Sequence, residues 1–279
     1  IVYDDEALDR YMTHAVQASP DKPILVDKFL QDAIEVDVDC ISDGTHVVLG
    51  AIMEHIEEAG IHSGDSACVL PPYTLSDTLQ EEISRATKAM AKELKVIGLM
   101  NVQYAVKDGD VYVIEVNPRA SRTVPFVSKA IGVPLAKLAA KVMMGKSLAE
   151  LGFTEEVTPD RFNVKVPVFP FNKFPGTDML LSPEMRSTGE VMGSDTELGY
   201  AFAKAYEAAG MRLPLRARVL MTVKHGDKRA IVSEARTLAQ LGYELLATGG
   251  TWRALRAAGL PVERINKVHE GRPHIVDAI

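Results

Sequence analysis

The chain has 279 residues, enough for about two domains of ordinary size. Hydrophobic residues make up 47% of it and charged residues 25%, at a mean hydropathy of +0.01, which excludes intrinsic disorder. A net charge of −7 without a Lys/Arg block argues against a nucleic-acid partner. No apolar run approaches the ~20 residues of a membrane span. Two cysteines, Cys40 and Cys68, suit neither a disulfide scaffold nor a metal site, so we expect a cytoplasmic protein.

The two ends of the sequence suggest a fragment. It opens at Ile1 without a methionine and stops at Ile279 within a predicted helical run. We therefore expect this chain to be a piece of a longer one.

Residues up to about 212 predict an α+β unit with antiparallel hairpins. Apolar spacing predicts helices and apolar–polar alternation predicts strands. The expected helices cover residues 4–20, 79–97, 124–131, 135–144 and 194–209, and the extended runs cover 23–29, 34–41, 47–56, 99–107, 111–117 and 163–169. We expect Gly98 to close the second helix, and the pairs Asp43-Gly44 and Asp108-Gly109 to form hairpin turns.

From residue 213 the pattern changes to alternating strands and helices. The expected strands are 218–223, 243–247 and 262–265, and the helices between them are 227–241 and 251–258. This βαβαβ order predicts a parallel sheet with right-handed crossovers. By its strand count, this second domain is cut short at residue 279.

A carboxylate and an amide follow each other on one predicted strand. Glu115 and Asn117 are two residues apart and share a face, and their oxygens suit Mg²⁺ bound with phosphates. Arg119 and Arg122 follow and could neutralise phosphate charge. With a three-residue loop the hairpin register places Gln103 opposite Glu115, whereas a two-residue loop places it on the other face. The alternative is a hairpin end with solvated polar groups.

Three further motifs have a structural and a functional interpretation each. Residues 60–66 form a glycine-punctuated loop that either exposes N–H groups to an anion or is a capped turn. Glu35, Asp37 and Asp39 share one strand face, which for Asp37 and Asp39 we expect to be solvated. Residues 247–251 either bind a phosphate-sized anion at a helix N-terminus, with Lys228 and Lys267 nearby, or form an ordinary connection.

Taken together, these segments resemble the large-subunit family of carbamoyl-phosphate synthases, and the resemblance runs from end to end. The matching segments are 34–39, 53–57, 62–67, 98–103, 115–129, 171–176, 183–193 and 266–274. The sequences of residues 62–64 and 123–126 are similar to the second of the family's two ATP-grasp halves, which phosphorylates carbamate.

The resemblance implies the back portion of an α+β ATP-grasp domain, followed by an α/β Rossmann-like, methylglyoxal-synthase-like domain, both incomplete. Residues 1–150 would be the C-terminal part of the ATP-grasp domain and 151–212 a connecting region. Residues 213–279 would be the N-terminal part of the allosteric domain.

The resemblance also implies roles, residue by residue. Two Mg²⁺ or Mn²⁺ ions would be held by Gln103, Glu115 and Asn117. ATP would be bound by Lys28, Leu30, Glu35, Gly60, Ile61, His62, Ser63, Gln103 and Glu115. Arg119 and Arg122 would be catalytic, steadying the phosphoryl group and carbamate. A nucleotide effector would be held by Lys228, Thr248, Thr251 and Lys267.

The implied enzyme is an ATP-dependent ligase of arginine and pyrimidine biosynthesis. Its substrates would be bicarbonate or carbamate and ammonia. Its partners would be a glutaminase small subunit, nucleotide effectors, ornithine as a further candidate effector, and other copies in an oligomer. We expect neither a nucleic-acid nor a membrane partner. The front half of the ATP-grasp domain lies upstream of Ile1, so we expect this fragment alone to be inactive. Lys28 stands where we expect His or another residue in close relatives.

Two alternatives stay open at this point. One is another ATP-grasp ligase, such as a biotin carboxylase relative, which would need a different downstream domain. The other is a nucleotide-sensing module that retains its ATP-grasp part as a scaffold only. Retention of Gln103, Glu115 and Asn117 favours the enzyme.

Overall fold

The computed structural model describes residues 2, 4–18, 23–24, 26–174 and 176–278. It divides into two compact units, Ile1–Met211 and Arg212–Ile279, each described here by itself. In the described part of the chain, no helix is both long and apolar enough to cross a bilayer.

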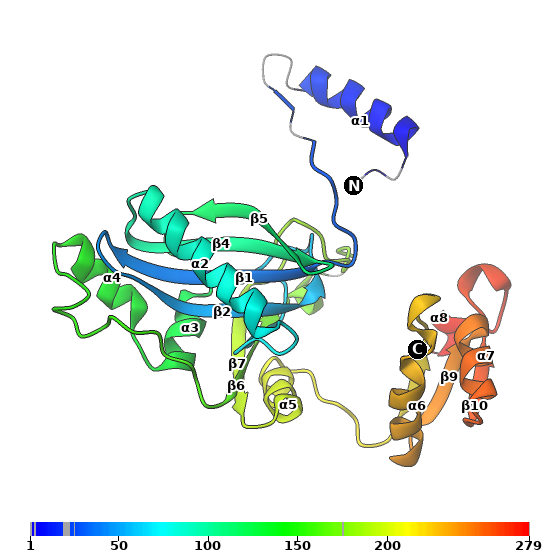
Figure 1. Ribbon diagram of the computed structural model, residues 1–279. Coiled ribbons are helices and arrows are strands. Elements are labelled where there is room, and N and C mark those ends of the chain that lie inside the picture. The colour runs from blue at the N-terminus through cyan, green and yellow to red at the C-terminus, as the bar shows by residue number, and fades with distance from the viewer. Residues whose placement is uncertain (1, 3, 19–22, 25, 175, 279) are drawn as a thin grey trace. The chain divides into compact units, whose positions relative to one another are not determined.

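Unit 1 is built on a seven-stranded antiparallel sheet in the order β5-β4-β1-β2-β3-β6-β7 (Figure 1). Its strands are β1 (Ile34–Asp43), β2 (Val47–Glu58), β3 (Cys68–Leu70), β4 (Ile97–Lys107), β5 (Asp110–Asn117), β6 (Phe162–Val168) and β7 (Gly189–Asp195). Its helices are α1 (Asp5–Ala18), α2 (Asp77–Glu93), α3 (Val124–Ile131), α4 (Leu135–Met143) and α5 (Leu198–Ala208), with a short 3₁₀ turn η1 (Phe171–Lys173).

Helices cover both faces of this sheet (Figure 1). Ile83 and Ala91 of α2 pack on Val36, Val38 and Cys40, which form one face of β1. The opposite face is covered at one end by α3 and α4, whose buried apolar residues enclose Ile41 and neighbours from β2 and β4. α3 and α4 therefore do not cover the polar end of that same face, which lies toward the start of β1.

A third core joins α5 to the β3, β6 and β7 side of the sheet. Gly193 of β7 allows this packing, because a Cβ there would lie 2.1 Å from the carbonyl oxygen of Ala201. The short strands β3 and β7 are absent from the sequence-based expectation. The expected helix over 194–209 is partly wrong, since residues 194–195 belong to β7 and the helix begins at Leu198.

Two other expectations also need correction. The run 23–29 forms no strand in its described residues, and residue 25 lies outside them, as do residues 19–20 of the first expected helix. The second helix ends at Glu93, before the expected Gly98. Lys95, with a φ of 51°, reverses the chain, and Gly98 lies inside β4.

Unit 2 confirms the parallel βαβαβ order. Its sheet has the order β10-β9-β8, and both pairs are parallel. The elements are β8 (Arg218–Met221), η2 (Gly226–Lys228), α6 (Ile231–Gln240), β9 (Glu244–Thr248), α7 (Gly249–Ala257), β10 (Val262–Ile265), η3 (Val268–Glu270) and α8 (Ile275–Ala278). Because parallel strands end at the same sheet edge, the segments that follow β8, β9 and β10 lie along one edge.

Candidate functional site

The acidic face of β1 is buried. Glu35 is 7% exposed, and Asp37 and Asp39 are each 1% exposed. The expectation that Asp37 and Asp39 face solvent is therefore wrong. The reason is the position of β1, which is paired with β2 on one side and β4 on the other in the middle of the sheet. Alternation alone does not distinguish a solvated face from one that lines an interior polar site.

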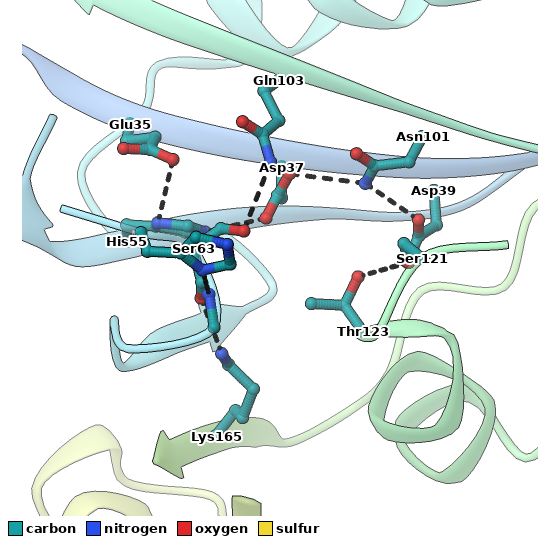
Figure 2. Close-up of polar contacts among 12 residues, drawn as sticks. Glu35, Asp37, Asp39, His55, Ser63, Asn101, Gln103, Ser121, Thr123 and Lys165 are labelled. Carbon is teal, nitrogen blue, oxygen red and sulfur yellow. Dashed lines mark hydrogen bonds and ion pairs between the residues drawn. The ribbon is translucent and has the colours of Figure 1, made fainter. Parts of the chain in front are cut away.

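Side chains from neighbouring elements surround these carboxylates, and they donate hydrogen bonds to Asp37 and Asp39 (Figure 2). The His55 ring on β2 lies between two of them, with Nε2 3.2 Å from Asp37 Oδ2 and Nδ1 3.7 Å from Glu35 Oε1. Asn101 Nδ2 on β4 donates to Asp37 Oδ1 at 3.3 Å and to Asp39 Oδ1 at 3.0 Å. Thr123 Oγ1 donates to Asp39 Oδ2 at 2.6 Å. A buried carboxylate needs such donors because desolvation is costly.

Burial also changes the acidity of these groups. Desolvation raises the pKa of Asp39 to about 6, although hydrogen bonds from Thr123, Ser121 and Asn101 favour the ionised form. Desolvation likewise raises the pKa of Glu35, and the nearby His55 opposes that shift. The raised pKa values mean that Glu35 and Asp39 hold their protons more tightly than they would in water.

The β4–β5 hairpin carries the three candidate oxygen ligands. Its turn is the two-residue Asp108-Gly109, both with positive φ, and Lys107 pairs with Asp110. Of the two loop lengths left open by the sequence, the two-residue loop is therefore present, which in a regular hairpin would place Gln103 on the other face. Even so, Gln103 lies opposite Glu115, because a bulge between Val113 and Glu115 shifts the register by one residue.

Asn117 is held beside Glu115. Its Nδ2 donates to Glu115 Oε1 at 2.7 Å, while Gln103 Nε2 donates to Ser63 Oγ at 3.2 Å. No three His, Cys, Asp or Glu side chains of the described residues are grouped to hold a metal ion. This set has one carboxylate, so a metal here would need the amide oxygens as ligands, which suits a hard cation that keeps phosphate or water oxygens.

Two cavities meet at these residues. The larger, of about 750 Å³, is lined by all nine residues expected to bind the nucleotide: Lys28, Leu30, Glu35, Gly60, Ile61, His62, Ser63, Gln103 and Glu115. The smaller, of about 360 Å³, is lined by Arg119, Arg122 and Lys165 among others. His62, Ser63, Gln103 and Glu115 line both cavities, whereas Asn117 lines neither.

The loop at residues 60–66 is held within the fold. The N–H of His62 donates to Ser182 O at 2.9 Å, that of Gly64 to His62 Nδ1 at 3.0 Å and that of Asp65 to His62 O at 2.7 Å. These three N–H groups are thus not exposed to an anion, which corrects the sequence-based hypothesis for them. The buried Lys165 holds the loop as well, donating from Nζ to Ser63 O at 3.1 Å (Figure 2).

Sequence reasoning missed Asp37, Asp39, His55, Asn101 and Lys165 as part of this region. The available signals were the alternation of Asp37 and Asp39 with the candidate Glu35, and the place of His55 and Asn101 within segments 53–57 and 98–103, which resemble the family. His55 and Lys165 are single residues on strands, and nothing in their local sequence shows which face is buried.

In unit 2 the structure gathers three of the four candidate effector residues. Thr248 Oγ1 lies 2.9 Å from Thr222 Oγ1, and Thr251 Oγ1 accepts the N–H of Val223 at 3.2 Å. Lys228 Nζ lies over the start of α7, where a Cβ on Gly250 would be 2.9 Å from it. Lys267 follows β10 at the same sheet edge, and its backbone N–H donates to Glu270 Oε2 at 3.0 Å.

We predict a pH signature for the buried Asp39. Its pKa is raised from 3.8 to about 6 by folding, so the stabilising proton is fully held below pH 3.8 and lost as the pH rises toward 6. Between pH 4 and 7 the wild-type free energy of unfolding should fall, relative to that of Asp39→Asn, by on the order of 3 kcal/mol.

Urea unfolding followed by far-ultraviolet circular dichroism measures this difference. Tryptophan fluorescence would not serve, because the single tryptophan, Trp252, lies in unit 2. Parallel stability profiles of the two proteins across this pH range would contradict the raised pKa.

Two family models match the chain. A model of the family "Carbamoyl-phosphate synthase L chain, ATP binding domain" matches residues 1–151, and a model of the MGS-like domain matches residues 230–279. The chain is 59% identical over 283 residues to the carbamoyl phosphate synthase large chain of Ralstonia nicotianae, 59% over 279 residues to that of Pseudomonas aeruginosa, and 57% over 279 residues to that of Vibrio cholerae. All of this chain is covered in each case, but only 26% of each relative.

Among solved structures, the biotin carboxylase domain of a single-chain bacterial carboxylase is similar at 17% identity and a TM-score of 0.48, covering 61% of this chain and 43% of that one. The family match includes more than half of the chain and an MGS-like domain follows it, which disfavours the biotin carboxylase alternative. The chain belongs to the carbamoyl-phosphate synthase large-chain family, with an ATP-grasp domain followed by an MGS-like domain.

Proposed function

We propose that this chain carries the site that phosphorylates carbamate with MgATP in carbamoyl phosphate synthesis. One observation carries the proposal. Gln103 and Glu115 lie where a large, partly apolar cavity meets a smaller one that Arg119 and Arg122 line, so a metal–phosphate group there would face both. The chain spans about a quarter of its relatives, so the full reaction belongs to the intact protein.

The larger cavity suits an adenosine. Leu30, Ile61 and Ile114 offer apolar contacts for the base, and the Glu35 carboxylate can accept hydrogen bonds from ribose hydroxyls. Lys28 and the residues 60–63 complete the contacts. Ser63 is already oriented toward Gln103 by their hydrogen bond, which links the nucleotide contacts to the proposed metal ligands.

The donor set of Gln103, Glu115 and Asn117 fits two Mg²⁺ or Mn²⁺ ions bound with the nucleotide phosphates. When bound, these ions would neutralise charge on the β- and γ-phosphates. The chain itself orients the ligands: the β5 bulge aligns Gln103 with Glu115, and the Asn117 amide nitrogen steadies the carboxylate.

Arg119 and Arg122 would act on the reacting group. Phosphoryl transfer forms a bond between a carbamate oxygen and the γ-phosphorus and breaks the bond to the ADP oxygen. The reaction needs alignment and charge neutralisation more than a covalent nucleophile. Two guanidinium groups beside the proposed metal ligands supply both, through hydrogen bonds to phosphoryl and carbamate oxygens.

In unit 2 we propose a site for the phosphate of a nucleotide effector. The hydroxyls of Thr248 and Thr251, the cation of Lys228 and the start of the nine-residue α7 lie together, and Lys267 would add charge from the same sheet edge. Effector binding here would regulate synthesis in the intact enzyme.

The remaining assignments follow from the family. We propose a glutaminase small subunit as partner, bicarbonate and ammonia as further substrates, ornithine as a further effector, an oligomeric cytoplasmic enzyme, and a role in arginine and pyrimidine biosynthesis. We also propose that residues 151–212 complete the synthetase component, since β6 and β7 extend the sheet that β1–β5 begin.

We predict that Glu115→Gln in the full-length parent enzyme lowers ATP formation from carbamoyl phosphate and MgADP at least ~100-fold, because one charge on the metal ligands is lost. Glu82→Gln, on the exposed side of α2, is the matched control and should leave the rate unchanged. A normal rate for Glu115→Gln would refute the metal assignment.

We predict that Thr248→Ala in the full-length enzyme weakens the response to a nucleotide effector about tenfold and leaves the basal rate intact. The expected size is that of one hydrogen bond to a charged group. The shift is read as the effector concentration that gives half the maximal change in rate. Thr237→Ala, on the exposed side of α6, should not shift the curve, and an unshifted curve for Thr248→Ala would remove this residue from the site.

A further inference from the structure

Thr123 stands at the start of α3 but does not cap it. It is the N-cap residue, yet its side chain bonds to no N–H of the helix. A threonine cap ordinarily contributes ~1 kcal/mol. Here the hydroxyl instead donates to Asp39 Oδ2 at 2.6 Å and lies 2.8 Å from Ser121 Oγ. The hydroxyl therefore joins the start of α3 to the central strand β1.

Asp39, which accepts the Thr123 hydrogen bond, is itself held in place. Asp39 is buried on β1, and its second oxygen accepts from Asn101 on β4. Asn101 is paired with Asn117 in the β4–β5 register, and Asn117 O accepts the N–H of Arg119 at 2.7 Å. Residues 118–123, the arginine segment, are thus attached to the sheet at both ends.

Between these two attachments lie the arginines of the smaller cavity. Arg119 Nη1 donates to Ala120 O at 3.2 Å, inside the same segment. Within the described residues, no ion pair fixes either guanidinium group of Arg119 or Arg122. Their position therefore depends on the backbone of the arginine segment, and so on its attachments.

We propose that Asp39 and Thr123 are positioning residues that hold Arg119 and Arg122 at the reacting phosphoryl group. The proposal rests on the proposed function of this cavity. Asp39 lines neither cavity and acts through Thr123. Thr123 itself lines the smaller cavity, and its hydroxyl acts by holding the backbone of the arginine segment. Misplacement of a catalytic group by ~1 Å can cost ~100-fold in rate, so loss of this bond should lower kcat more than it changes nucleotide binding.

The test uses the full-length parent enzyme and the formation of ATP from carbamoyl phosphate and MgADP. Thr123→Val removes the hydroxyl at nearly constant shape and should lower kcat 10- to 100-fold, with the KM for MgADP within twofold of wild type. Thr123→Ser retains the hydroxyl and should stay near wild type. In an Asp39→Asn background, Thr123→Val should cost less, because the same bond is already weakened.

The chain offers a matched control. The Thr74 hydroxyl also donates to a buried carboxylate, that of Glu54, which lines neither cavity. Thr74→Val should therefore leave kcat unchanged. Equal losses in Thr74→Val and Thr123→Val would overturn the proposal, as would an unchanged kcat in Thr123→Val.

Amide hydrogen exchange separates this proposal from the proposed function. The amides of residues 119–124 should exchange at least tenfold faster in Thr123→Val and not in Thr74→Val, whether or not the enzyme makes ATP. Unchanged exchange would refute the attachment even if Glu115→Gln is inactive. Faster exchange with an active Glu115→Gln would retain the attachment and reject the metal assignment instead.

Discussion

Burial of three carboxylates on one face of β1 is the constraint on which unit 1 depends. Glu35, Asp37 and Asp39 lie in the middle of the sheet, where an ionised group without donors would be strongly destabilising. The donors come from β2, from β4 and from the start of α3. Each of these elements also leads to a part of the proposed site, so the same bonds that satisfy the acids align the site.

A bulge in the β4–β5 hairpin also aligns residues of the proposed site. A two-residue turn sets one register near the tip, and the bulge at Ile114 changes it before Glu115. Because side chains alternate between faces, one extra residue moves Gln103 to the face of Glu115. The bulge thus brings together two side chains, Gln103 and Glu115, whose oxygens are proposed metal ligands and which a regular hairpin would place on opposite faces.

Much of the fold could be predicted from the sequence. The hairpins, α3, α4 and the parallel order of unit 2 follow from apolar periodicity and from glycine at turns. Three-residue β3 carries too short a pattern to recognise. The end of α2 was misplaced because Gly98 offered a plausible stop, whereas Lys95 adopts the left-handed conformation that reverses the chain.

The sequence predicts the motifs that line the site, but not the buried residues that hold those motifs in place. Residues near the cavities come from segments that carry recognisable local patterns, such as Glu115 with Asn117. No local pattern shows that Asp39, Asn101 and Lys165 are buried, because their role depends on which strand lies in the middle of the sheet and which loop covers it. A two-residue loop alone predicts that Gln103 lies on the other face from Glu115, but the bulge at Ile114 adds one residue and pairs the two.

The most direct test of this account is Mn²⁺ binding to the full-length parent enzyme with ADP, followed by electron paramagnetic resonance. If Gln103 shares the face of Glu115, Gln103→Leu should weaken Mn²⁺ binding about tenfold and alter the spectrum of the bound ion. Gln80→Leu on α2 should change neither. Identical Mn²⁺ affinity and spectra for wild type and Gln103→Leu would mean that Gln103 is not a ligand, and would contradict the arrangement on which the proposed function rests.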